Sequence, residues 1–232
     1  MSDNIDRARR LRHLPLFPLP LVMLPGEVLP LHIFEDRYRQ MLRDVETAGT
    51  FFGILLFEPD AAFAEKPPAG SVGCVAEVRE SELLPDGRSN IVTQGLVRFR
   101  LIDYVQTSDP YLVGNLEFFD DEPGDPAELG PLADEVFTLF ERMAKAAFKM
   151  SGQRGRIPEI PRTDPESLSF LITAAFIFDN AKKYALLQST STSERLQELR
   201  SILQPAVGQM EESADIQRAA QTNGHSKKKI KL

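Results

Sequence analysis

The residues with the clearest chemical potential gather around one charged segment, FEDRYR at 34–39. His32 and Glu35 stand three residues apart, a spacing at which two side chains can share a metal ion. Zinc sites need at least three protein ligands, and no third candidate lies nearby in the sequence. The alternative is that His32 is a strand-end residue, hydrogen-bonded within the fold. We therefore predict no metal site.

Glu35 is also a candidate general acid or base. That role requires a partner group with a matched pKa and a cleft, and neither is visible in the sequence. The competing interpretation is an ion-pair network on one helical turn, in which Glu35 or Asp36 pairs with Arg39 while Tyr38 packs inward. We favour this structural interpretation, so the segment supplies no predicted catalytic residue.

The motifs of common enzyme classes are missing from the sequence. The dipeptide Gly-Lys does not occur, which excludes the phosphate-binding pattern G-x-x-x-x-G-K-[ST], and neither G-x-G-x-x-G nor G-x-S-x-G is present. Cys74 is the single cysteine, so no intrachain disulfide can form. Its apolar surroundings favour a buried hydrophobic residue over a reactive thiol. We predict a protein that is not an enzyme and binds no cofactor.

Charge and hydropathy limit the classes of partner and the cellular compartment that the sequence allows. The net charge of −7 disfavours general nucleic-acid binding, which needs clustered Lys and Arg. The apolar run at 14–25 follows basic residues and so imitates a secretion signal, but its prolines would break the helix that such a signal forms. The run is also far shorter than the roughly 20 apolar residues of a membrane span. We predict a cytoplasmic protein without a membrane partner.

The elements that must position the charged segment follow from hydrophobic periodicity. Prolines force extended backbone over 14–33, and a helical period then starts at Phe34 and runs to Gly49. Strands are predicted at 51–57, 71–84, 90–106 and 111–119, with a hairpin turn at PDGRS and a bulge or close backbone approach at Gly95. This half of the chain favours a small barrel.

The second half of the chain has helical periodicity. Apolar stripes predict helices over 132–148, 165–178, 181–188 and 195–203, and Pro205 is predicted to end the last one. Ser191 and Glu194 have the spacing of a capping box. The fold class is therefore α+β. The predicted organisation is a flexible N-terminus at 1–13, a β subdomain at 14–122, a helical subdomain at 126–204 and a disordered tail at 205–232 that ends in the basic run KKKIK.

Two long motifs carry a resemblance to a known family. LPLFPLPLVMLPGEVLPLHIFEDRYRQML at 14–42, and the hairpin sequence G-R-x-N followed by Gly95 and R-F-R, resemble the N-terminal substrate-binding domain of Lon ATP-dependent proteases. The resemblance extends over about residues 14–204. The ATPase and protease domains of full Lon proteases have no counterpart in this sequence, so the chain resembles the stand-alone proteins that consist of the substrate-binding domain only.

The resemblance implies a PUA-like pseudobarrel with one inserted helix, followed by a helical bundle. The implied activity is recognition of unfolded or damaged polypeptide segments without hydrolysis, in an adaptor or regulator of proteolysis and protein quality control, with a separate ATP-dependent protease as a further partner. The implied peptide-binding residues are Phe34, Glu35, Arg37 and Tyr38. The alternatives are an RNA-binding protein, because PUA-like folds also serve RNA metabolism, and an unrecognised enzyme.

Overall fold

The computed structural model describes residues 2–58, 65–151 and 159–223 of the chain. These divide into two compact units, one formed by Met1–Glu122 with Phe170–Thr190 and the other by Pro123–Ser169 with Ser191–Leu232. This division differs from the predicted boundary, which assigned all of 126–204 to one helical subdomain. Residues 170–190 instead belong with the strands, because their apolar side chains complete a core cluster there.

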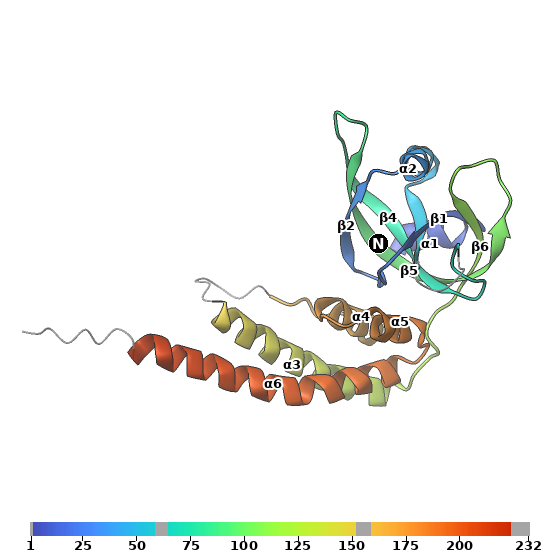
Figure 1. The fold of residues 1–232 in the computed structure, drawn as a ribbon. Coiled ribbons are helices and arrows are strands. Elements are labelled where there is room, and N and C mark those ends of the chain that lie inside the picture. Colours follow the sequence, from blue (N-terminus) through green and yellow to red (C-terminus); the bar gives the residue numbers. More distant parts are fainter. Residues whose placement is uncertain (1, 59–64, 152–158, 224–232) are drawn as a thin grey trace, which may run out of the picture. The chain divides into compact units, whose positions relative to one another are not determined.

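One mixed sheet of six strands forms the first unit (Figure 1). Its strands are β1 (His13–Leu19), β2 (Val28–Ile33), β3 (Phe51–Leu56), β4 (Val72–Leu83), β5 (Ser89–Val105) and β6 (Leu112–Phe118). The strand order is β2-β5-β4-β3-β1-β6, and among the described strands β1 pairs with β3 in parallel while the other pairings are antiparallel. Because the long strand β5 also pairs with β6, the series of pairings from β5 through β4, β3, β1 and β6 returns to β5. Strand β2 lies outside this series.

The proline-rich opening stretch forms two short strands, as predicted. Pro15 and Pro18 lie within β1, and Pro30 lies within β2. The backbone turns between the strands at Gly26, whose φ of +79° is a conformation that glycine adopts without steric cost. The turn is held where the Gly26 amide donates to the carbonyl of Gly95 at 2.9 Å.

The predicted period change after Ile33 marks helix α2 (Asp36–Ala48). Its buried residues Tyr38, Met41, Leu42 and Val45 recur at helical spacing and enter the same core cluster as Phe17 and Phe52. The helix ends at Gly49, as predicted, with a φ of +143° and its amide bonded to the carbonyl of Val45. The inserted helix therefore covers one side of the sheet with a continuous apolar face.

The N-terminal segment corrects one prediction. Residues predicted to be flexible contain helix α1 (Ser2–Arg9), and Ala8 is fully buried in a cluster with Leu14 and Leu16. Arg9 forms an ion pair with Asp120. The segment is mostly polar, so its sequence did not indicate the few contacts that attach it to the strands.

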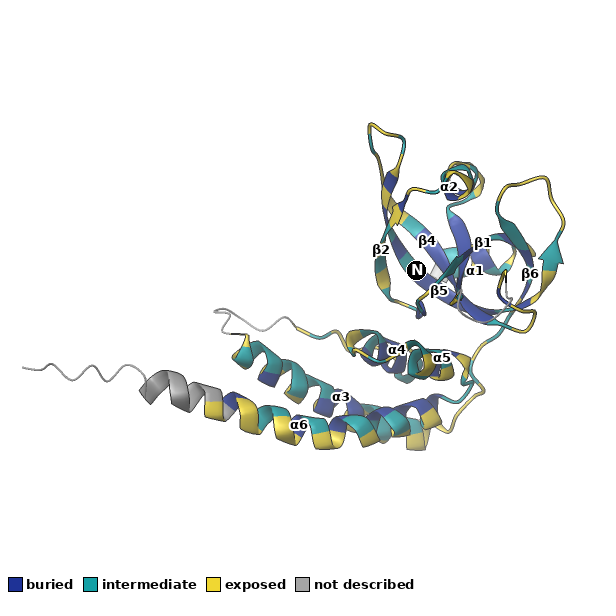
Figure 2. Cartoon of the chain, viewed as in Figure 1, coloured by how far each residue is buried: buried dark blue, intermediate teal, exposed yellow. Residues whose placement is uncertain are grey.

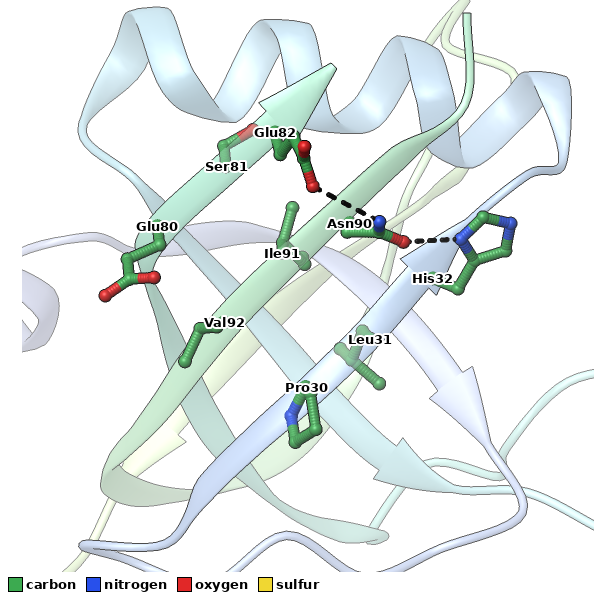
Figure 3. A pocket seen from close by; sticks show the side chains of 9 residues that line it. All are labelled: Pro30, Leu31, His32, Glu80, Ser81, Glu82, Asn90, Ile91 and Val92. Carbon is green, nitrogen blue, oxygen red and sulfur yellow. Dashed lines mark hydrogen bonds between the residues drawn. The ribbon is translucent and has the colours of Figure 1, made fainter. Parts of the chain in front are cut away.

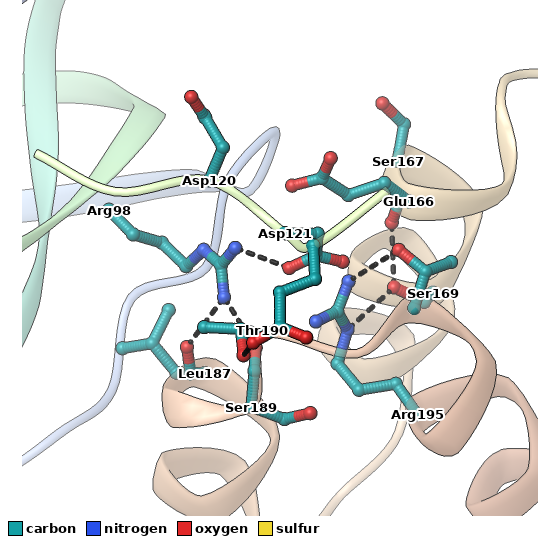
Figure 4. Close-up of polar contacts among 12 residues, drawn as sticks. Arg98, Asp120, Asp121, Glu166, Ser167, Ser169, Leu187, Ser189, Thr190 and Arg195 are labelled. Atoms are coloured by element: carbon teal, nitrogen blue, oxygen red, sulfur yellow. Dashed lines mark hydrogen bonds and ion pairs between the residues drawn. The ribbon is translucent and has the colours of Figure 1, made fainter. Parts of the chain in front are cut away.

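Two short helices accompany the sheet. They are α4 (Pro165–Ala175), whose residues from Phe170 onward belong to the first unit, and α5 (Asn180–Gln188). Phe170 and Leu187 pack with Val22, Leu24 and Val72. The buried guanidinium of Arg98 joins these parts (Figure 4), since it pairs with Asp121 and donates to the carbonyls of Leu187 and Ser189.

The second unit is built on two long helices, α3 (Pro126–Met150) and α6 (Thr192–Asn223), which pack along each other. Asp125 caps α3, and the predicted cap of α6 forms where the Glu194 amide donates to the Ser191 hydroxyl at 3.2 Å. Exposed ion pairs Arg142–Glu211 and Arg200–Glu135 connect the two helices.

Helix α6 overturns the prediction that Pro205 ends it and that a disordered tail begins there. The helix continues through Pro205 to Asn223, while residues 224–232, including KKKIK, lie outside the described residues. A helix-interior proline costs about 3 kcal/mol or more. The buried stripe Leu196, Leu199, Leu203, Val207 and Ala214 runs on both sides of the proline, and its packing outweighs that cost (Figure 2).

Within the parts of the chain described here, no helix has the length and apolar content to cross a bilayer.

Candidate functional site

The predicted peptide-binding residues lie where β2 passes into α2. Phe34 is 59% exposed, and its ring stacks with that of His32 at a centroid distance of 6.1 Å. This exposure leaves the Phe34 ring accessible for contact with another molecule.

Glu35 and Arg37 form an ion pair beside Phe34. Glu35 precedes the helix in an extended conformation, and its carbonyl accepts from the amides of Tyr38 and Arg39 in the first turn. Its carboxylate makes no capping bond and instead pairs with Arg37, with Nη2 and Oε2 2.7 Å apart. Arg39 pairs with Asp36 at 2.9 Å. The predicted ion-pair network therefore forms, with Asp36 and not Glu35 as the partner of Arg39.

Tyr38 is part of the core and not of the surface. Its side chain is buried, with the ring 4.2 Å from that of Phe17, and burial raises the pKa of its hydroxyl. The Arg37 guanidinium lies 4.7 Å above the Tyr38 ring. Of the four predicted residues, Phe34, Glu35 and Arg37 therefore reach the surface, and Tyr38 holds Arg37 from below.

A groove of about 540 Å³ lies beside this junction, across the outer face of β2, β5 and β4 (Figure 3). Sequence reasoning did not identify it. Its lining consists of Pro30, Leu31, His32, Glu80, Ser81, Glu82, Asn90, Ile91 and Val92. The available signal was the alternation in VRESEL and NIVTQ, whose outward positions become one surface only when the hairpin pairs with β2.

Strand register sets the composition of the groove. Pro30 pairs with Val92, which pairs with Glu80, and His32 pairs with Asn90, which pairs with Glu82. Residues opposite each other in antiparallel strands project to the same face. The groove thus has an apolar row beside a polar row, with a carboxylate at the β4 end of each.

The polar row is internally connected. His32 Nδ1 lies 2.8 Å from Asn90 Oδ1, and Asn90 Nδ2 lies 3.4 Å from Glu82 Oε2. His32 is thus the hydrogen-bonded strand-end residue that the alternative interpretation described. Among the residues the structure describes, no group of three or more His, Cys, Asp and Glu side chains could hold a metal ion.

The free edge of the sheet adjoins the groove. Within the described residues β2 pairs with β5 alone, so one side of its backbone has no strand partner. Because Pro30 has no amide hydrogen, it suits a position that faces away from the ladder. Val28, two residues earlier, is 61% exposed. An unpaired strand with exposed apolar side chains can accept a further extended segment.

Comparison with known proteins identifies the family. Residues 13–205 match the model of the ATP-dependent protease La (LON) substrate-binding domain. The chain belongs to this family.

Relatives and solved structures agree with that assignment. The Lon protease of Brevibacillus choshinensis is 28% identical over 197 residues, which are 83% of this chain and 25% of that protein. The Lon protease of Xanthomonas oryzae pv. oryzae is 29% identical over 194 residues, 79% of this chain and 22% of that protein. The crystal structure of a Lon N-terminal domain protein from Xanthomonas campestris has a TM-score of 0.61 at 25% identity and covers 82% of this chain and 98% of that one.

The N-terminal domain of the Mycobacterium avium complex Lon protease has the same fold, with a TM-score of 0.59 at 18% identity over 83% of this chain and 98% of that one. The chain spans about a quarter of the length of the curated relatives. It matches the Lon substrate-recognition module, an α+β domain.

Proposed function

We propose that this protein binds extended segments of unfolded or damaged polypeptide at the edge of β2 and in the adjoining groove. The observation that carries the proposal is the coincidence of three features at one place: an unpaired strand edge, a groove of about 540 Å³ and the exposed apolar side chains of Val28 and Phe34. Family membership supplies the class of ligand.

Binding at this place needs no covalent step. A polypeptide strand beside β2 gains backbone hydrogen bonds, and side-chain contacts in the groove add selectivity. Pro30 offers only its carbonyl, so pairing along β2 is interrupted at its centre. We expect weak, reversible binding and propose that the chain recognises polypeptide without cleaving it.

We further propose the setting in which this recognition acts. The protein serves as an adaptor or regulator in proteolysis and protein quality control in the cytoplasm, with a separate ATP-dependent protease as a partner. We also propose that the strand-rich unit is a PUA-like pseudobarrel and that the helical half forms a bundle. The return of the strand pairings to β5, and the packing of α3 on α6, support these two assignments.

Charge at the groove argues against the nucleic-acid alternative. Glu80 and Glu82 line it without a lysine or arginine among the lining residues. A phosphate backbone would be repelled there, whereas binding to it requires cationic side chains.

A binding measurement with a reduced, permanently unfolded model protein tests the proposal. We expect micromolar binding, with no cleavage in the presence or absence of ATP. Phe34→Ala should weaken binding severalfold, because exposed aromatic residues are frequent anchors. Ile216→Ala is the matched control, since Ile216 is 64% exposed but lies on α6. Cleavage of the substrate, or no binding at micromolar concentrations, would contradict the proposal.

A further inference from the structure

We infer that the groove selects extended polypeptide segments in which lysine or arginine alternates with apolar residues. This inference rests on the proposed function and names the substrate class for the same site. It follows from the charges, the register and the apolar floor of the groove.

The two carboxylates of the groove lack a cationic partner. Glu80 makes no hydrogen bond or ion pair within the described residues, and Glu82 receives only the 3.4 Å contact from Asn90. Both are exposed and project to the same face of β4 (Figure 3). Two unneutralised acceptors beside a groove favour a cationic ligand group.

The nearest arginine along β4 is already engaged. Arg79 donates to Gln94 Oε1 at 2.7 Å and pairs with Glu77 at 3.1 Å. It stands at the irregularity of the β4 ladder between Val78 and Glu80, outside the lining of the groove. The Arg79 guanidinium is therefore shared between Gln94 and Glu77, and no contact joins it to Glu80 or Glu82 among the described residues.

The apolar floor explains why lysine and arginine fit better than a simple cation. Pro30 and Val92 lie side by side in the row that ends at Glu80. Lysine and arginine have long apolar stems that pack on such a surface while the charged head reaches a polar group. One side chain can thus cover Val92 and meet the carboxylate of Glu80.

A set of three short fluorescent peptides tests this selectivity on the full chain. The peptides share their apolar residues and differ only at alternating positions, which hold Lys, Glu or Ser. By fluorescence anisotropy at low salt, we expect the Lys peptide to bind most tightly and the Glu peptide most weakly. The double variant Glu80→Gln/Glu82→Gln should weaken binding of the Lys peptide about three- to tenfold, the range for two exposed ion pairs. Its affinity for the Ser peptide should not change.

The matched control is Glu46→Gln/Glu128→Gln, which removes the same charge from exposed residues outside the groove. It should bind the Lys peptide as the wild type does, and added salt should reduce the preference for that peptide. The inference is overturned if Glu80→Gln/Glu82→Gln leaves Lys-peptide affinity unchanged, or if the Glu peptide binds equally well. If the Ser peptide still binds and Phe34→Ala weakens it, the proposed function stands without this selectivity. If neither the peptides nor the unfolded protein binds, the proposed function fails as well.

Discussion

The guanidinium of Arg98 lies 2.5 Å from the carboxylate of Asp121, and the two side chains are only 2% and 5% exposed. The rings of Phe119 and Phe170 flank the guanidinium at 4.6 and 5.1 Å from their centroids. The carbonyls of Leu187 and Ser189 accept hydrogen bonds from its Nη1 atom. One buried arginine therefore ties β5 to the segment after β6 and to the end of α5.

Replacing Asp121 by Asn tests this connection. The variant removes the carboxylate that pairs with a buried guanidinium, and breaking such a buried pair costs about 3–5 kcal/mol in the free energy of unfolding. Urea unfolding followed by circular dichroism measures the loss. Glu135→Gln is the control, because it breaks the exposed pair with Arg200 and should cost about 1 kcal/mol or less. Equal effects of the two substitutions would refute the structural importance of Arg98.

Gly95→Ala tests the close approach of two backbones. A Cβ atom at Gly95 would lie 2.1 Å from the carbonyl oxygen of Leu24, which is backbone and cannot move aside cheaply. We expect a loss of about 2–4 kcal/mol, typical of severe overpacking. At Gly130, within α3, a Cβ would meet nothing within 4 Å. Gly130→Ala should therefore stabilise the protein by about 0.5–1 kcal/mol, because alanine has the higher helix propensity. Urea unfolding curves of the two variants should show changes of opposite sign in the free energy of unfolding.

The Tyr38 substitutions separate a core role from a binding role. Tyr38→Ala empties a buried site against Phe17 and should reduce stability by about 3–5 kcal/mol. Tyr38→Phe keeps the ring, so both stability and binding of the unfolded model protein should stay close to wild type. A marked loss of binding in a stable Tyr38→Phe variant would show that the hydroxyl contacts the ligand, contrary to its buried position.

Cys74 gives the protein a specific response to alkaline pH. Complete burial raises the pKa of its thiol from 9.0 to about 12. The folded state then keeps the proton that the unfolded state releases. The stabilising contribution is fully present below pH 9 and is lost as the pH rises from 9 toward about 12.

Two measurements check this response. A thiol reagent near neutral pH should label Cys74 only after unfolding, and Cys74→Ala should remove part of the alkaline loss of stability. Rapid labelling of the native protein would contradict the buried position.

The sequence by itself determined the elements whose signals are local. The change of period after Ile33, the end of α2 at Gly49 and the N-terminal cap of α6 at Ser191 depend on residues within a few positions of each other, so they were predictable. The prolines likewise indicated extended backbone in the opening strands. The family signature is also a property of residue order alone, so the sequence is sufficient to recognise it.

Tertiary structure decided everything that depends on which distant segments meet. Pro205 breaks an isolated helix, yet packing on α3 carries α6 through it. The alternation of residues along β5 shows which face Arg98 occupies. It does not show that Asp121 and the end of α5 will surround the Arg98 side chain and bury it. The groove exists because β2 pairs with a hairpin that begins about 40 residues later, which brings Pro30, Val92 and Glu80 into one row. Local periodicity specifies which face a residue occupies, but only the pairing of strands specifies what lies beside it.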